Sequence, residues 1–132
     1  MLKKVDHIGL AVRNVDEIAN MFAALFGLEA EIIEDHPGLK AAFLHIGDVA
    51  VEPLQPTDKK HSTAQFLDRH GNGIHHICFE VDDVDRELQA LAAKGVELID
   101  KKGRQGLTGK IGYLHPSSTE GILIELVQKI KG

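Results

Sequence analysis

Cysteine is almost absent from this chain, because Cys78 is the only one among its 132 residues. A single thiol excludes an intramolecular disulfide framework and favours a reducing compartment, so we expect a cytoplasmic protein. Long apolar runs are also missing, which excludes a membrane-spanning helix of about 20 apolar residues. The first residues meet a charge at Asp6 before an apolar run can develop, so we expect no secretory signal peptide.

An excess of positive charge is the third feature that the sequence lacks. The formal net charge is −5 at pH 7, and this acidic balance argues against nucleic acid or an anionic membrane as the main partner. The 43% apolar and 27% charged residues are normal for a globular protein. The length suits one domain with a real core, and the eight histidines direct attention to metal binding.

A self-match at a fixed offset is the strongest feature that is present. The pattern His-Ile-x-x-x-Val begins at His7 and again at His76, 69 residues later, and Val15-Asp16 recurs at the same offset as Val84-Asp85. Repetition at a fixed period indicates one supersecondary unit used twice. Within a single domain of residues 1–132 we therefore expect module one at about 1–56, a connection at about 57–72 and module two at about 73–132.

Hydrophobic periodicity predicts the order β-α-β-β-β in both modules. Asn14 and Asp83 are suited to begin a helix in each module, and Gly27 and Gly95 to end it. The expected strands are 5–12, 28–34, 39–46 and 49–54 in module one, and 74–81, 96–100, 110–115 and 122–127 in module two. A short helix is expected at 62–70, and the glycine-containing segment 103–109 is expected to be a mobile loop.

Two such modules cannot bury their sheets separately at this length, so the sheets should curl toward each other with the helices outside. We therefore predict an α+β fold. In it, two tandem β-α-β-β-β modules form a cupped, partly open eight-stranded sheet around a metal site.

Each module carries a lone carboxylate, Glu52 or Glu125, in an otherwise apolar strand. A buried ionised glutamate is costly unless it is paired or binds a metal. With His7 and His76, the two glutamates make a donor set suited to Zn²⁺, Co²⁺, Ni²⁺ or Mn²⁺. Taken singly, a strand histidine is more often structural, and a glutamate followed by Pro53 more often marks an edge. The register of all four residues across the repeat favours a metal site.

Other polar residues have weaker claims to a functional role. His75 points away from His76 along an alternating strand and is expected to be structural. His115 precedes a proline and should shape a turn, whereas His45 could line a pocket. Cys78 is expected to be a small filler on the pocket wall.

With these residues in view, the chain resembles the vicinal oxygen chelate superfamily over nearly its whole length. Within that superfamily it is most similar to the methylmalonyl-CoA epimerase family. Three stretches carry the resemblance: Ser62–Leu67 followed by Gly73–Ile77, then Tyr113–Thr119, then Gly121–Leu126. The first two stretches are quite specific. The two histidines and two glutamates alone are not, since glyoxalase I shares them.

The resemblance implies a metal-dependent epimerase that abstracts the α-proton of an acyl-CoA thioester and forms an enolate stabilised by the metal. It implies metal ligation by His7, Glu52, His76 and Glu125, and it leads us to expect a homodimer. Ala41 stands where some members carry a glutamate base. We therefore assign the acid/base pair to Glu125 and, as the substitute, Glu52, where some members have a glutamine ligand.

The anionic CoA tail should meet basic residues, and the candidates are Lys40, Arg104 and Lys110. One alternative function is a glyoxalase I-like lactoylglutathione lyase, which would use the same metal and the same proton transfer. A second is a non-catalytic small-molecule binding protein, but such members of the superfamily typically lack the four ligands.

Overall fold

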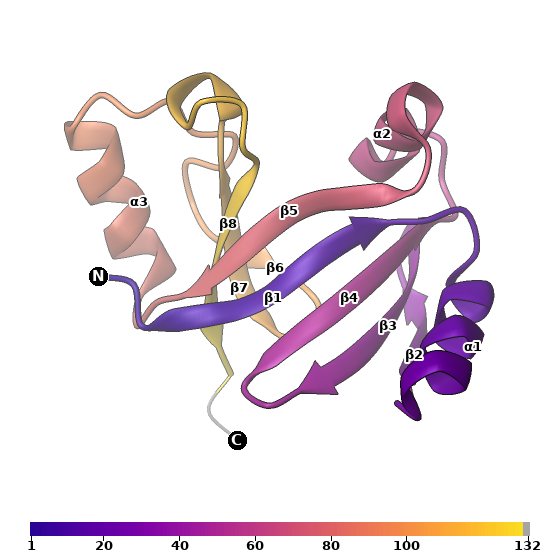
Figure 1. Ribbon diagram of the computed structural model, residues 1–132. Helices are drawn as coiled ribbons and strands as arrows, with labels where there is room; N and C mark the ends of the chain where they lie inside the picture. The colour runs from indigo at the N-terminus through magenta and orange to yellow at the C-terminus, as the bar shows by residue number, and fades with distance from the viewer. Residues whose placement is uncertain (131–132) are drawn as a thin grey trace. The chain divides into compact units, whose positions relative to one another are not determined.

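The computed structural model describes residues 1–130, which form eight β-strands and three α-helices (Figure 1). The chain divides into two compact units. One consists of residues 7–75, and the other combines residues 1–6 with the described residues from His76 onward. Each unit carries one copy of the β-α-β-β-β order, which confirms the predicted α+β class and the two-module plan.

The unit of residues 7–75 holds strands in the order β2-β3-β4-β1. Strand β1 is parallel to β4, and the other neighbours are antiparallel. Its elements are β1 (Lys4–Ala11), α1 (Val15–Phe26), β2 (Glu31–His36), β3 (Leu39–Ile46), β4 (Val49–Pro56) and α2 (Ser62–His70). Helix α1 packs against β3 and β4 (Figure 1).

The second unit repeats this plan with strands in the order β5-β8-β7-β6. Strand β5 is parallel to β8, while β7 is antiparallel to both of its neighbours. Its elements are β5 (Gly73–Glu80), α3 (Val84–Ala93), β6 (Arg104–Gln105), β7 (Gly109–Leu114), a 3₁₀ turn (Pro116–Ser118) and β8 (Ile124–Lys129). Helix α3 packs against β7 and β8.

Capping side chains begin the first helix of each unit as the sequence predicts. The Asn14 side chain accepts a hydrogen bond from the backbone N–H of Glu17, and the Asp83 side chain accepts one from Arg86. Helix α1 ends at Gly27, whose φ of 67° lies in the left-handed region that favours glycine. The two helices are thus started in the same way, 69 residues apart.

Equivalent apolar residues form the cores of the two units. Val12 and Val15 pack with Ala42 in one unit, and Val81 and Val84 pack with Leu88, Leu114 and Leu126 in the other. The 69-residue offset relates Val12 to Val81 and Val15 to Val84. Val15 and Val84 are the first residues of the helices, so each helix packs against the valine that follows the first strand of its unit.

The predicted strand at 96–100 is wrong. This segment runs beside β7, but only Leu98 forms a bridge, to Leu114. The backbone N–H groups of Ile99 and Asp100 both donate to the Tyr113 carbonyl, at 3.0 and 3.2 Å, which breaks the ladder. The Tyr113 N–H then donates to the Asp100 carboxylate at 2.8 Å instead of to a backbone carbonyl. Pairing resumes at β6, inside the segment that was expected to be a loop.

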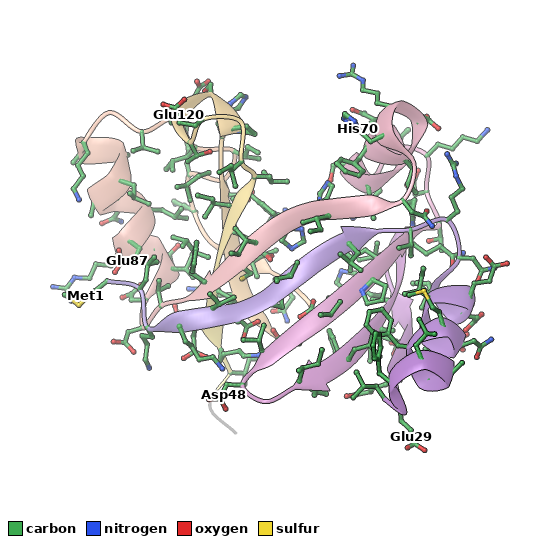
Figure 2. The ribbon with its side chains drawn as sticks, in the orientation of Figure 1. Met1, Glu29, Asp48, His70, Glu87 and Glu120 are labelled. Atoms are coloured by element: carbon green, nitrogen blue, oxygen red, sulfur yellow. The ribbon has the colours of Figure 1, made fainter. Side chains whose placement is uncertain are left out.

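The first residues of the chain contact the other parts of the second unit, to which they belong. The backbone N–H of Lys3 donates to the Glu80 carbonyl at 2.9 Å. The Met1 ammonium pairs with the Glu87 carboxylate on α3, and the two residues lie side by side in Figure 2. None of the helices within residues 1–130 is long and apolar enough to cross a membrane.

Candidate active site

One of the two predicted histidine–glutamate pairs lies in the unit of residues 7–75. His7 projects from β1 and Glu52 from the neighbouring parallel strand β4, where Gly9 is the register partner of Glu52. His7 Nδ1 lies 3.0 Å from Glu52 Oε2. Both side chains are buried, so any charge on either is shielded from water and depends on its partner.

The second unit holds the equivalent pair. His76 projects from β5 and Glu125 from the parallel strand β8, where Cys78 is the register partner of Glu125. Since Gly9 and Cys78 are 69 residues apart, the two glutamates occupy equivalent places. His76 Nε2 lies 3.1 Å from Glu125 Oε1, and both side chains are buried. Each unit therefore brings one imidazole and one carboxylate into contact away from solvent.

Tyr113 is a further residue beside the second pair, and no separate role was predicted for it from the sequence. It is the register partner of Glu125 on the neighbouring strand, so its side chain lies beside that carboxylate. Its ring meets the His76 ring edge-on, with centroids 5.5 Å apart. Burial, followed by the negative charge of Glu125, raises the pKa of Tyr113 well above its usual value of 10.0. Tyr113 is therefore a neutral hydrogen-bond donor at physiological pH.

Comparison with known proteins shows the family. Residues 6–113 match the Glyoxalase/Bleomycin resistance protein/Dioxygenase superfamily. The chain belongs to this superfamily.

Several relatives that match nearly the whole chain are named as epimerases. The chain is 32% identical to the mitochondrial methylmalonyl-CoA epimerase of Dictyostelium discoideum, over 96% of this chain and 78% of that protein. A variant of the Streptomyces coelicolor methylmalonyl-CoA epimerase, in complex with 2-nitronate-propionyl-CoA, is 32% identical with a TM-score of 0.89, covering 96% of this chain and 94% of that one. The Mycobacterium tuberculosis methylmalonyl-CoA epimerase is 29% identical with a TM-score of 0.89, covering 98% and 90%. This member of the superfamily is thus an epimerase-like enzyme.

Lys40 and Lys110, two of the basic candidates, take part in equivalent ion pairs. Lys40 Nζ lies 2.8 Å from Asp16 Oδ2, and Lys110 Nζ lies 2.8 Å from Asp85 Oδ2. The hydrogen bond to Asp16 raises the pKa of Lys40, and the hydrogen bond to Asp85 raises that of Lys110. These repeated contacts tie a strand to the first turn of a helix in both units of the superfamily fold.

Arg104, the third basic candidate, lies next to Tyr113. Its guanidinium carbon is 5.7 Å from the centre of the Tyr113 ring, within the range of a cation–π interaction. Its Nε donates to Asp100 Oδ1 at 2.9 Å, while Asp100 Oδ2 accepts the Tyr113 N–H at 2.8 Å. The Asp100 carboxylate therefore holds Arg104 and Tyr113 together.

The remaining candidates have local contacts. The His75 ring meets the Phe66 ring edge-on at 5.2 Å, and His115 accepts a hydrogen bond from the Ser117 N–H in the turn that it begins. Cys78 is fully buried in an apolar cluster. Ala41 is also fully buried, and it brings no carboxylate to its place on β3.

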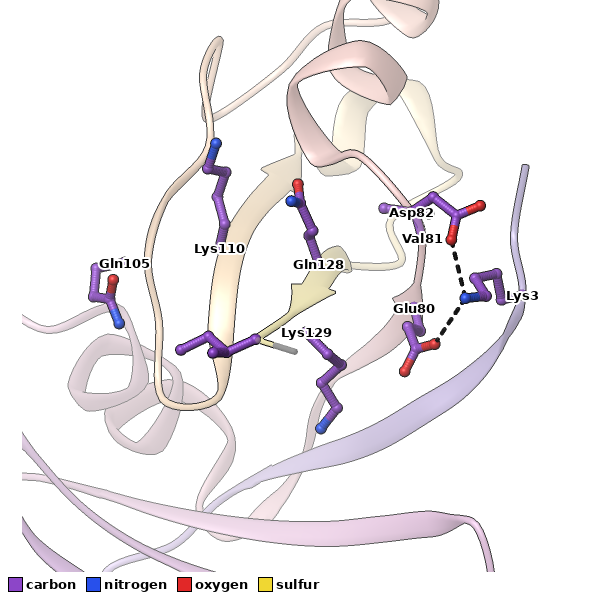
Figure 3. A pocket seen from close by; sticks show the side chains of 9 residues that line it. Lys3, Glu80, Val81, Asp82, Gln105, Lys110, Gln128 and Lys129 are labelled. Atoms are coloured by element: carbon purple, nitrogen blue, oxygen red, sulfur yellow. Dashed lines mark ion pairs between the residues drawn. The ribbon is translucent and has the colours of Figure 1, made fainter. Parts of the chain in front are cut away.

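A cavity of about 600 Å³ lies at the other end of the strands that carry Tyr113 and Glu125 (Figure 3). Its lysines face carboxylates. Lys3 Nζ lies 2.9 Å from Asp82 and 3.7 Å from Glu80, and Lys129 Nζ lies 3.0 Å from Asp6. Because acids balance its cations, this cavity does not favour an anion. It is lined by Lys3, Glu80, Val81, Asp82, Gln105, Lys110, Gln128, Lys129 and Ile130.

Proposed function

We propose that this protein is a metal-dependent epimerase that interconverts the epimers of methylmalonyl-CoA. The observation that carries the proposal is the duplicated buried pair, His7 with Glu52 and His76 with Glu125, at equivalent places of the two units. The relatives named as methylmalonyl-CoA epimerases supply the substrate class. They also favour this activity over the lactoylglutathione lyase and the binding-protein alternatives.

The donor atoms of the two pairs suit a divalent ion. Two ligand atoms at right angles on an ion with bonds of about 2.1 Å lie about 3 Å apart. The separations in the two pairs are 3.0 and 3.1 Å. Imidazole nitrogens and carboxylate oxygens together suit Zn²⁺, Co²⁺, Ni²⁺ or Mn²⁺. We therefore propose these four residues as the ligands of one such ion.

Epimerisation requires a proton to leave one face of the α-carbon and to return to the other. A bound divalent ion supplies Lewis-acid stabilisation of the negative charge that develops on the thioester oxygen. In the proposed mechanism Glu125 exchanges the proton on one face and Glu52 on the other. Glu52 takes the second role because Ala41 offers no carboxylate. Tyr113, the register partner of Glu125, stays neutral beside that carboxylate because its pKa is raised.

Deuterium exchange at the substrate α-carbon tests this assignment. Each epimer of methylmalonyl-CoA is incubated separately in D₂O with the metal-loaded enzyme, and exchange is followed by NMR. The wild type should exchange both epimers, Glu125→Gln should stop exchange from at least one, and Glu52→Gln from the other. Glu29→Gln is the matched control because Glu29 is exposed (Figure 2). Full exchange of both epimers by Glu125→Gln would overturn the role of Glu125.

Metal content and substrate choice are tested in parallel. Chelation should abolish exchange, and adding back each of the four ions separately identifies those that restore it. A side-by-side assay with the methylglyoxal–glutathione adduct should give no lyase product. If that adduct reacts and methylmalonyl-CoA does not, the lyase is the correct function. The expected homodimer and cytoplasmic location remain predictions, to be tested by sedimentation and by fractionation.

A further inference from the structure

The two units share their structural contacts, so residues at which they differ are informative. Lys40 and Lys110 make equivalent ion pairs, and the two histidine–glutamate pairs are also equivalent. The proposed metal ligands are one histidine and one glutamate from each unit, so they are nearly symmetric. A methylmalonyl thioester has two different ends. Groups that recognise one end of such a substrate should therefore lie where the repeat is broken.

The two units differ at β2 and β6, the strands that pair with β3 and β7. On β2, Ile33 is the register partner of Ala41. On β6, Arg104 is the register partner of Ile111, which follows Lys110 as Ala41 follows the equivalent Lys40. A charged guanidinium thus replaces an apolar side chain. The irregular backbone at Asp100 accompanies this replacement.

The Arg104 guanidinium is held in place by part of its surface, and its other hydrogen-bond donors stay available. Nε is bound to Asp100, and the cation lies over the Tyr113 ring. Within residues 1–130, the two Nη amino groups have no hydrogen-bond acceptor, and the side chain is 54% exposed. The planar fork of arginine can bind two oxygens of a carboxylate or a phosphate at once. Asp100 fixes the fork in advance, which reduces the entropy lost on binding.

Arg104 differs from Lys40 and Lys110 in the residues that it contacts. Tyr113 contacts Arg104 through its ring face, and it contacts both His76 and Glu125. Arg104 is therefore one residue away from the proposed acid/base group. The lysines instead place their Nζ atoms on helix-start aspartates.

We propose that Arg104 is a specificity-determining residue that donates its Nη hydrogens to an anionic oxygen of the substrate, a carboxylate or a phosphate. This inference rests on the proposed function, because that function supplies a substrate with both groups.

Kinetics with two thioesters test the inference. Methylmalonyl-CoA carries the carboxylate and the phosphates, whereas methylmalonyl-pantetheine carries only the carboxylate. Arg104→Gln should raise KM tenfold or more for a substrate that it contacts, which is about the effect of one lost charged hydrogen bond, with a smaller change in kcat. Arg104→Lys should recover only part of the loss because it lacks the fork. Lys110→Gln is the matched control and should change KM much less.

A binding measurement without turnover shows whether Arg104 contacts the carboxylate or a phosphate. It also tests the role of Arg104 separately from the proposed epimerase function. Calorimetry with propionyl-CoA, which has the phosphates but no free carboxylate, should show weaker binding by Arg104→Gln if the contact is to a phosphate. Unchanged propionyl-CoA binding with a raised KM for methylmalonyl-pantetheine identifies the carboxylate. If the wild type binds propionyl-CoA through Arg104 but exchanges neither epimer, the proposed function fails and the inference stands.

Three results overturn the inference. In the first, Arg104→Gln matches the wild type in both KM values and in propionyl-CoA affinity, while the wild type remains an active epimerase. In the second, Lys110→Gln raises KM as much as Arg104→Gln does. In the third, the wild type neither binds nor turns over any of the thioesters, and the proposed function falls as well. Circular dichroism of each variant confirms that it is folded.

Discussion

Tyr113 and Glu125 lie directly opposite each other on β7 and β8, and the negative charge of the glutamate acts on the tyrosine hydroxyl. Ionisation of Tyr113 would place a second negative charge beside Glu125 in a buried place. The pKa of Tyr113 is accordingly raised, chiefly by burial and then by Glu125. The folded state therefore holds the tyrosine proton to a higher pH than the unfolded state.

This pKa shift predicts a loss of stability in alkali. The contribution of Tyr113 is fully present below its ordinary pKa of 10.0 and falls as the pH rises from there through the higher folded value. Between pH 8 and pH 11 the free energy of unfolding should fall more steeply for the wild type than for Tyr113→Phe. Because the chain has one tyrosine and no tryptophan, tyrosinate absorbance reports this group alone. Ionisation of the folded protein below pH 10 would contradict the prediction.

Two glutamines supply equivalent acceptors at the helix starts. Gln55 Oε1 accepts the Val15 N–H at 2.9 Å, and Gln128 Oε1 accepts the Val84 N–H at 3.1 Å. Both valines are fully buried, so removing either acceptor leaves a buried N–H without its partner. Gln55→Ala and Gln128→Ala should each lower the free energy of unfolding by about 1–2 kcal/mol.

Urea denaturation of the glutamine variants measures this loss. Gln89→Ala on α3 is the control, since Gln89 is exposed and should change the free energy of unfolding by less than about 0.5 kcal/mol. A loss for only one of the two buried glutamines would show that the repeated contact is not used equally in the two units.

The features that both units share could be predicted from the sequence. The offset between His7 and His76 revealed two modules, and the lone carboxylates in apolar strands indicated Glu52 and Glu125. The structure confirms the modules and brings each histidine to a glutamate within its own unit. That all four residues hold one ion stays a prediction.

Prediction from the sequence was wrong or incomplete where the two units differ. Alternation at 96–100 resembles a strand, but the Asp100 side chain replaces a backbone acceptor. No local pattern signals that substitution, because it depends on Tyr113 from a distant strand. Arg104 was one of three basic candidates, and its position over the Tyr113 ring, together with the equivalent ion pairs of Lys40 and Lys110, separates it from the two lysines.

Asp100→Asn should disturb both groups that the carboxylate holds. The amide keeps one acceptor oxygen and loses the charge, so it cannot satisfy both the Tyr113 N–H and Arg104 Nε. We expect the free energy of unfolding to fall by about 1–3 kcal/mol and KM to rise in the same direction as in Arg104→Gln. Asp35→Asn, at an exposed position of β2, should do neither.

A double-mutant cycle shows whether Asp100 acts through Arg104. If it does, the KM of the double variant should match that of Arg104→Gln rather than the product of the two single effects. Fully additive effects would mean that Asp100 influences the substrate by another route.

Gly112 on β7 lies against the Leu88 and Val84 side chains of α3. A Cβ at this position would lie 2.8 Å from Leu88 Cδ1, whereas a Cβ at Gly73 would meet nothing nearer than 3.7 Å. Leu88 is fully buried among apolar residues, so it has little room to move away. Gly112→Ala should lower the free energy of unfolding by about 1–3 kcal/mol through overpacking, while Gly73→Ala should have little effect. Equal stabilities of the two variants in urea would show that the helix can shift to accommodate the methyl group.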